Sequence, residues 1–71
     1  MIHLNPYPYI DVTVSAGRVE LLRDAAYRAA LRIVEHESLS ADITDIRLED
    51  IQPITNLYGH YALAHVKLTL K

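Results

Sequence analysis

The sequence has 71 residues, no cysteine, a formal net charge of −2 at pH 7 and a pI near 6.0. A chain this short buries only about 60% of the surface that its unfolded form exposes, so a lone monomer would be marginally stable. Disulfides and thiolate metal sites are excluded because they need cysteine, which leaves oligomerisation or a histidine–carboxylate metal site to supplement the core. The weak net charge argues against a nucleic-acid partner. The N-terminus lacks the features of a secretion signal or a membrane span. We expect one cytoplasmic domain, residues 1–71, with no membrane contact.

The first element expected is an extended arm at residues 1–8, which leads into a strand at residues 9–15. Pro6 and Pro8 each fix their own backbone φ angle and push the preceding residue toward extended geometry. In the following segment, YIDVTVS, apolar residues alternate with polar ones. This alternation is typical of a strand with one buried face.

An amphipathic helix is expected at residues 18–37, with Ser15 or Gly17 as the residue that caps its N-terminus. Asp24 and Arg28 have the spacing of a favourable ion pair on one helical face. The 3.6-residue period also places an alanine-rich apolar stripe on the side that we expect to face a sheet. The stripe consists of Val19, Leu22, Ala26, Ala29, Ala30 and Ile33.

Two further strands are expected at residues 42–51 and 60–70. In the first of them, Ile43 and Ile51 are out of phase with the apolar residues between them, which indicates a bulge or a strong twist. The same strand carries a cluster of acidic residues that we interpret as a solvated edge rather than a cation site, since they lack the order of a calcium-binding loop. The cluster consists of Asp42, Asp45, Glu49 and Asp50.

The last strand contains two histidines, His60 and His65, five positions apart. Successive side chains of a strand point to opposite faces, so these two cannot bind one metal ion within a single chain. We expect no metal site in the monomer, while a site built between two copies stays open. His65 shares its face with Lys67, whose charge we expect to disfavour the protonated imidazole. His36, near the helix end, is explained by a favourable interaction with the helix dipole.

Together these elements indicate an α+β protein of order β-α-β-β, with a three-stranded antiparallel sheet wrapped on one amphipathic helix. One helix covers only one face of such a sheet. All five aromatic residues are tyrosines, which are favoured where a surface is buried against a partner but keeps a polar group. We expect the uncovered face and the arm to form a homo-oligomeric interface; its predicted residues are Tyr7, Tyr9, Tyr61, Leu63 and His65. An open ferredoxin-like half, completed by a second copy, has the same element order and is the alternative fold.

The element order, the helical stretch Asp24-Ala25-x-x-Arg28-Ala29 and the long alternating last strand resemble the dodecins. Dodecins are small flavin-binding proteins that assemble as hollow spherical dodecamers. In that family, flavin stacks on a tryptophan early in the second strand and is hydrogen-bonded by a glutamine at the start of the third. This chain has no tryptophan, and Tyr61 falls about where the glutamine would be. The resemblance implies at most a site for flavin or another planar aromatic ligand at Tyr58, Tyr61 and Ile43.

We therefore predict a small self-assembling structural or protein-interaction module of dodecin-like shape, without catalysis. Storage or sequestration of flavin, or of another planar ligand, is the alternative, and the missing tryptophan favours the first reading. No G-x-S-x-G, P-loop, G-x-G-x-x-G or H-E-x-x-H motif is present. An enzyme would need an active site built between copies, with His60, His65 or Tyr61 beside a carboxylate such as Asp11.

Overall fold

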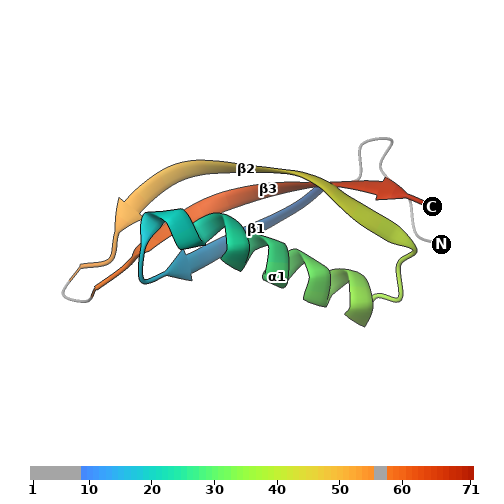
Figure 1. Ribbon diagram of the computed structural model, residues 1–71, viewed down its shortest axis with the longest axis horizontal. Coiled ribbons are helices and arrows are strands. Elements are labelled where there is room, and N and C mark those ends of the chain that lie inside the picture. The colour runs from blue at the N-terminus through green and yellow to red at the C-terminus, as the bar shows by residue number, and fades with distance from the viewer. Residues whose placement is uncertain (1–8, 56–57) are drawn as a thin grey trace.

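The computed structural model describes residues 9–55 and 58–71. Its elements are β1 (Tyr9–Ala16), the 3-10 turn η1 (Val19–Leu21), α1 (Leu22–His36), β2 (Ala41–Pro53) and β3 (His60–Leu70) (Figure 1). The expected α+β class is confirmed, with one α-helix and a three-stranded antiparallel sheet in the described part of the chain. The arm expected at residues 1–8 lies outside the described residues.

The strand order is β1-β3-β2, so the C-terminal strand β3 lies in the middle of the sheet. Every residue of β1 pairs with β3, from Tyr9 opposite Lys67 to Ala16 opposite His60. Both neighbours of β3 run antiparallel to it, and α1 lies along one side of the sheet (Figure 1). β1 and β2 therefore form the two edges of the sheet.

β2 is irregular and changes its register against β3 twice, between Ile43 and Asp45 and between Glu49 and Gln52. At each place β2 has one more residue than β3, which is the definition of a bulge. Asp50, in the second irregularity, has a φ of 53°, a left-handed conformation that is uncommon outside glycine. Of the two alternatives expected from the out-of-phase isoleucines, a bulge or a strong twist, the structure shows a bulge, and it occurs twice.

The helix begins later than expected because its first turn, η1, is a tight 3-10 turn. Neither Ser15 nor Gly17 caps it, so that prediction was wrong. Ser15 is still part of β1, where it pairs with Tyr61, and the residue before η1 is Arg18, which makes no capping side-chain hydrogen bond. No helix in residues 9–55 and 58–71 is long and apolar enough to cross a membrane.

The core lies between α1 and one face of the sheet and is built mostly from small side chains. Among the described residues ten apolar side chains are buried, and four of them are alanines. They are Val14, Leu22, Ala26, Ala30, Val34, Ile46, Ala62, Ala64, Val66 and Leu68. Val19 of the expected stripe is exposed because it lies in η1, and Val34 joins the core instead. Of the residues that the structure describes, only Leu22 and Val66 are large and fully buried, so the core is thin.

The molecule is elongated, with extents of 43 × 20 × 19 Å. Its radius of gyration is 13.1 Å, whereas a compact chain of this length has roughly 11 Å. An elongated shape leaves more surface in contact with water for each buried side chain. The shape and the thin core therefore both limit what one chain can contribute to its own stability.

Candidate functional site

α1 covers one face of the sheet and leaves the other, the open face, uncovered (Figure 1). The buried residues of β3 all have even numbers, so its odd-numbered residues lie on the open face together with their partners on β1 and β2. The open face is formed by Tyr9, Asp11, Thr13, Ser15, Asp42, Asp45, Arg47, Glu49, Gln52, Tyr61, Leu63, His65, Lys67 and Thr69. It combines tyrosine hydroxyls, one leucine and charges of both signs.

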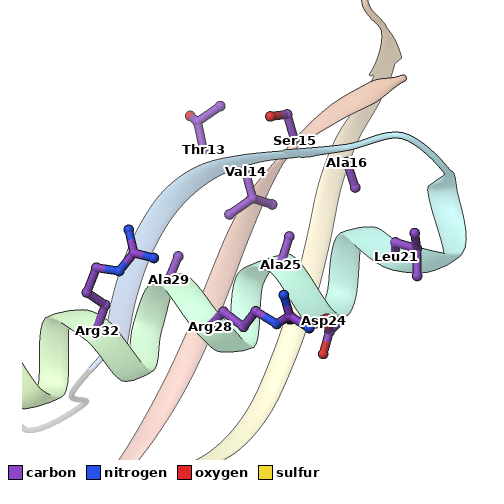
Figure 2. A pocket seen from close by; sticks show the side chains of 10 residues that line it. All are labelled: Thr13, Val14, Ser15, Ala16, Leu21, Asp24, Ala25, Arg28, Ala29 and Arg32. Carbon is purple, nitrogen blue, oxygen red and sulfur yellow. Dashed lines mark ion pairs between the residues drawn. The ribbon is translucent and has the colours of Figure 1, made fainter. Parts of the chain in front are cut away.

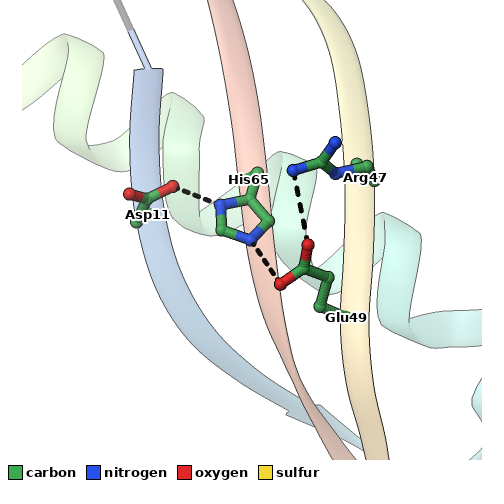
Figure 3. Close-up of polar contacts among 4 residues, drawn as sticks. All are labelled: Asp11, Arg47, Glu49 and His65. Carbon is green, nitrogen blue, oxygen red and sulfur yellow. Dashed lines mark hydrogen bonds and ion pairs between the residues drawn. The ribbon is translucent and has the colours of Figure 1, made fainter.

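His65 lies at the centre of the open face and contacts a carboxylate from each neighbouring strand (Figure 3). Its Nδ1–H donates a hydrogen bond of 2.6 Å to Oδ1 of Asp11 on β1. Its Nε2 lies 3.1 Å from Oε2 of Glu49 on β2, an ion-pair contact without the alignment of a hydrogen bond. Oε1 of the same Glu49 lies 3.3 Å from Nη2 of Arg47. We call these four residues the His65 network; it links all three strands through one imidazole.

The strand register explains why these side chains meet. Asp11 and Arg47 are the residues directly opposite His65 on the two neighbouring strands. Glu49 lies two residues further along β2, opposite Leu63, and reaches His65 diagonally. Direct and diagonal neighbours on one face are the pairs that interact across strands.

The two carboxylates raise the pKa of His65 above its ordinary value of 6.5. Contact with Glu49 is the larger cause and the hydrogen bond to Asp11 the second, while partial burial of the ring opposes both. The expectation that Lys67 disfavours the protonated imidazole was therefore wrong in its net result. The sequence places Lys67 on the same face, but the ring's closest charged contacts are the two acidic side chains across the strands.

A hollow of about 380 Å³ lies beside the His65 network on the open face. It is lined by Tyr9, Asp11, Asp45, Arg47 and His65. Two carboxylates, a guanidinium and an imidazole make this lining strongly polar. Such a surface suits a partner that also carries charges of both signs better than it suits an uncharged planar ring.

Four of the five predicted interface residues lie on the open face. Tyr9 and Tyr61 are exposed, at 50% and 42%, and Leu63 and His65 are partly buried. Leu63 stands in the middle of β3, opposite Thr13 on one side and Glu49 on the other. Tyr7 lies outside the described residues. Whether this face is an interface stays a prediction, but the fold does gather these side chains on one surface.

The three predicted ligand-binding residues are not brought together within one chain. Tyr58 is fully exposed in the connection before β3, and Tyr61 lies on the open face. Ile43 packs against the core on the opposite face, where it pairs with Leu68. Seven strand residues separate the levels of Tyr61 and Leu68, which is roughly 23 Å along the sheet. A ligand contacting all three would need residues from more than one subunit.

The histidines of β3 lie on opposite faces, as the alternation predicts, because both bulges are in β2 and β3 itself is regular. His60 lies at the entrance of β3, where its Nδ1 is buried and finds no hydrogen-bond partner among the described residues. Within residues 9–55 and 58–71, no three histidine or acidic side chains are grouped so that they could hold a metal ion. The four acidic residues of β2 are exposed along its length.

The sequence contained a partial signal for the His65 network. Alternation places Asp11 on the polar face of its strand and His65 on the corresponding face of β3, so their meeting follows once the two strands pair. Glu49 was not foreseeable as a partner, because the bulges of β2 set which of its acidic residues reaches His65.

Comparison of the chain with protein-family models, with curated proteins and with solved structures found no match.

Proposed function

We propose that this chain is the subunit of a homo-oligomer, a structural or protein-interaction module of dodecin-like shape whose open face is covered by another copy. The proposal assigns the chain no catalysis. It rests on one observation above all: the uncovered face carries a leucine and two exposed tyrosines around a polar centre, while the core on the other face is thin.

The thin core is the first support. In residues 9–55 and 58–71, only two large side chains, Leu22 and Val66, are fully buried, and the chain has no cysteine with which to compensate. Chains of this size usually need disulfides, a metal or a partner. A second copy on the open face would add the burial of Tyr9, Tyr61 and Leu63 to the stability of each subunit.

The chemistry of the open face is the second support. Asp11, Asp45 and Glu49 lie close to Arg47 and Lys67, so the face presents negative and positive groups side by side. A two-fold interface brings the same patch together from both subunits, and such a patch must complement itself. A surface of one sign would repel its own copy, whereas a surface with both signs offers opposite charges that can pair across a two-fold axis.

Storage of flavin or another planar ligand stays a prediction without a specific observation in its favour. Tyr61 and Ile43 lie on opposite faces of one subunit, so a site of this kind would form only between subunits. Native mass spectrometry, which gives the subunit number of the oligomer, would also detect the mass of a bound ligand.

Native mass spectrometry of three variants tests the proposal. Leu63→Glu and Tyr61→Glu place a charge on the open face, so each should convert the wild-type oligomer into a smaller species. Tyr27→Glu is the matched control, because Tyr27 is 45% exposed on α1 and Tyr61 is 42% exposed on the open face. We expect Tyr27→Glu to keep the wild-type mass.

Circular dichroism establishes that each variant is folded before its mass is compared. A wild-type protein that runs only at its 8.1 kDa monomer mass would refute the proposal. The same conclusion would follow if both open-face variants kept the wild-type subunit number.

A further inference from the structure

The two edges of the sheet differ in how well they are protected against pairing. β2 has two bulges, ends in Pro53 and carries four exposed carboxylates, all of which discourage an added strand. β1 pairs with β3 in unbroken register and contains no proline, glycine or lysine. In the described part of the chain no strand pairs with the outer side of β1. β1 is therefore an unprotected edge, a condition that folded proteins normally relieve by covering it.

A groove of about 530 Å³ runs beside this edge, between β1 and the flank of α1 (Figure 2). The side chains of Val14 and Ala16 point toward it from the strand, and those of Ala25 and Ala29 line it from the helix. The alanines leave room at the flank where a larger side chain would fill the groove. A second copy paired along β1 would bring its own helix to this flank.

We propose that β1 pairs antiparallel with β1 of a second copy, about a two-fold axis at Thr13, so that two three-stranded sheets join into one sheet of six strands. This inference rests on the proposed function, since it takes the partner to be the same chain. It adds a second contact, along the sheet edge, to the contact proposed for the open face.

The residues of β1 suit this register. With Thr13 opposite its own copy, Val12 lies opposite Val14 of the second copy on the helix side of the sheet. Asp11 lies opposite Ser15 of the second copy on the open face. β-branched side chains and hydroxyl pairs are favourable across strands, and no like charges meet.

The helix flank favours an axis near Thr13. Figure 2 shows Leu21 below Ala16 at one end of the groove, with Arg28 further along the helix. The seven residues from Leu21 to Arg28 rise about 10 Å, the length of about three strand residues, which places Arg28 level with Thr13. A two-fold axis at this level brings the two helices side by side and antiparallel, with Arg28 near the axis.

The two Arg28 side chains meet near this axis, each paired with Asp24 of its own chain, and the charges on either side of them complement each other. Asp24, Arg28 and Arg32 all line the groove at intervals of four residues. Within its own chain Asp24 pairs with Arg28 at 3.1 Å, and Arg32 makes no ion pair among the described residues. About an axis at Arg28, Arg32 of each copy comes to the level of Asp24 of the other.

A single cysteine tests the register, because the natural chain has none. In Thr13→Cys, directly opposite positions of an antiparallel pair bring the two Cα atoms to about 4.5–5.5 Å, within the range of a disulfide. In Ser15→Cys, on the same face two residues along, the two cysteines stand roughly 13 Å apart and cannot bond. Mild oxidation should therefore cross-link Thr13→Cys and leave Ser15→Cys as single chains on a non-reducing gel.

The same cysteine in a Leu63→Glu background separates this inference from the proposed function. Edge pairing predicts that Thr13→Cys with Leu63→Glu still cross-links, since the edge contact does not use the open face. Adding Arg32→Asp should lower the yield of dimer, and adding Asp24→Arg as well should restore it.

Two results overturn the edge pairing. One is a wild-type oligomer whose Thr13→Cys variant does not cross-link, which leaves the proposed function intact. The other is equal cross-linking of Thr13→Cys and Ser15→Cys, which indicates random collision. A protein that is monomeric before oxidation would refute both the proposed homo-oligomer and the pairing of β1 with a second copy.

Discussion

His65 shows how one side chain can hold an uncovered sheet face together. Apolar contacts between strands need cover from water to be effective, and no described residue covers the open face. The imidazole instead contacts Asp11 on one neighbouring strand and Glu49 on the other. Both contacts are strongest when the ring carries a proton, because each partner is then an opposite charge.

The titration of His65 checks this role. Because its folded pKa is raised above the unfolded value of 6.5, the network stabilises the fold fully below that value. The stabilisation is lost as pH rises through the folded pKa. An NMR titration of the imidazole should give a pKa above 6.5 in the wild type, and lower values in Glu49→Gln and Asp11→Asn.

Asp42→Asn is the control for this titration, since the carboxylate of Asp42 pairs with Lys71 at 3.3 Å instead. It should leave the pKa of His65 unchanged. If Glu49→Gln and Asp11→Asn also left it unchanged, the carboxylates would not be the cause of the shift.

Among the elements, the β2–β3 hairpin depends on the backbone of one glycine. Gly59 has a φ of 124°, and a Cβ placed on it would lie 2.8 Å from the carbonyl oxygen of Ala16. Its own carbonyl accepts a hydrogen bond of 3.1 Å from the N–H of Ile54. The hairpin therefore needs glycine here for its conformation and for its contact with the end of β1.

Gly59→Ala should lower the free energy of unfolding by about 1–3 kcal/mol, from backbone strain and the contact with Ala16. Gly17→Ala is the matched control, because a Cβ at Gly17 meets nothing within 4 Å. Its effect should stay within about 0.5 kcal/mol. Urea denaturation of the two variants at one protein concentration makes the comparison, and equal stabilities would contradict the strain argument.

At the scale of the whole molecule, stability should depend on protein concentration. A subunit that binds its own copies is stabilised by mass action, by about 1.4 kcal/mol for each tenfold increase in free partner. For a domain of this size that corresponds to a rise in melting temperature of roughly 5 °C or more. Thermal melts over a range of concentrations should show the rise, with a smaller slope in Leu63→Glu. A melting temperature independent of concentration would indicate a self-sufficient monomer.

Periodicity was enough to predict the fold class. The alternation in residues 9–15 and 60–70 and the helical period between them led to the α+β class and to the open face. The start of the helix and the register of β2 were harder to predict from the sequence. The 3-10 start of the helix has no side-chain cap to mark it, and the bulges of β2 depend on pairing with β3, which the sequence of β2 alone does not contain.

Some residues of the candidate site were likewise predictable from the sequence, and others were not. Tyr9, Tyr61, Leu63 and His65 fall on one surface because a regular strand preserves alternation. Glu49 joins His65 only through the bulged register of β2, and Ile43 lies on the opposite face from Tyr61, away from the ligand group in which the sequence placed it. Residues of regular strands were therefore predictable, and those of the irregular strand were not.

The two bulges of β2 have a consequence for how far growth along the sheet can proceed. In polymer chemistry, a monomer with two reactive ends forms chains, whereas a monomer with one reactive end forms only pairs. Since β2 is blocked by its bulges, its carboxylates and Pro53, the subunit is monofunctional along the sheet direction. Raising its concentration then increases the yield of six-stranded pairs and does not lengthen them into a fibre.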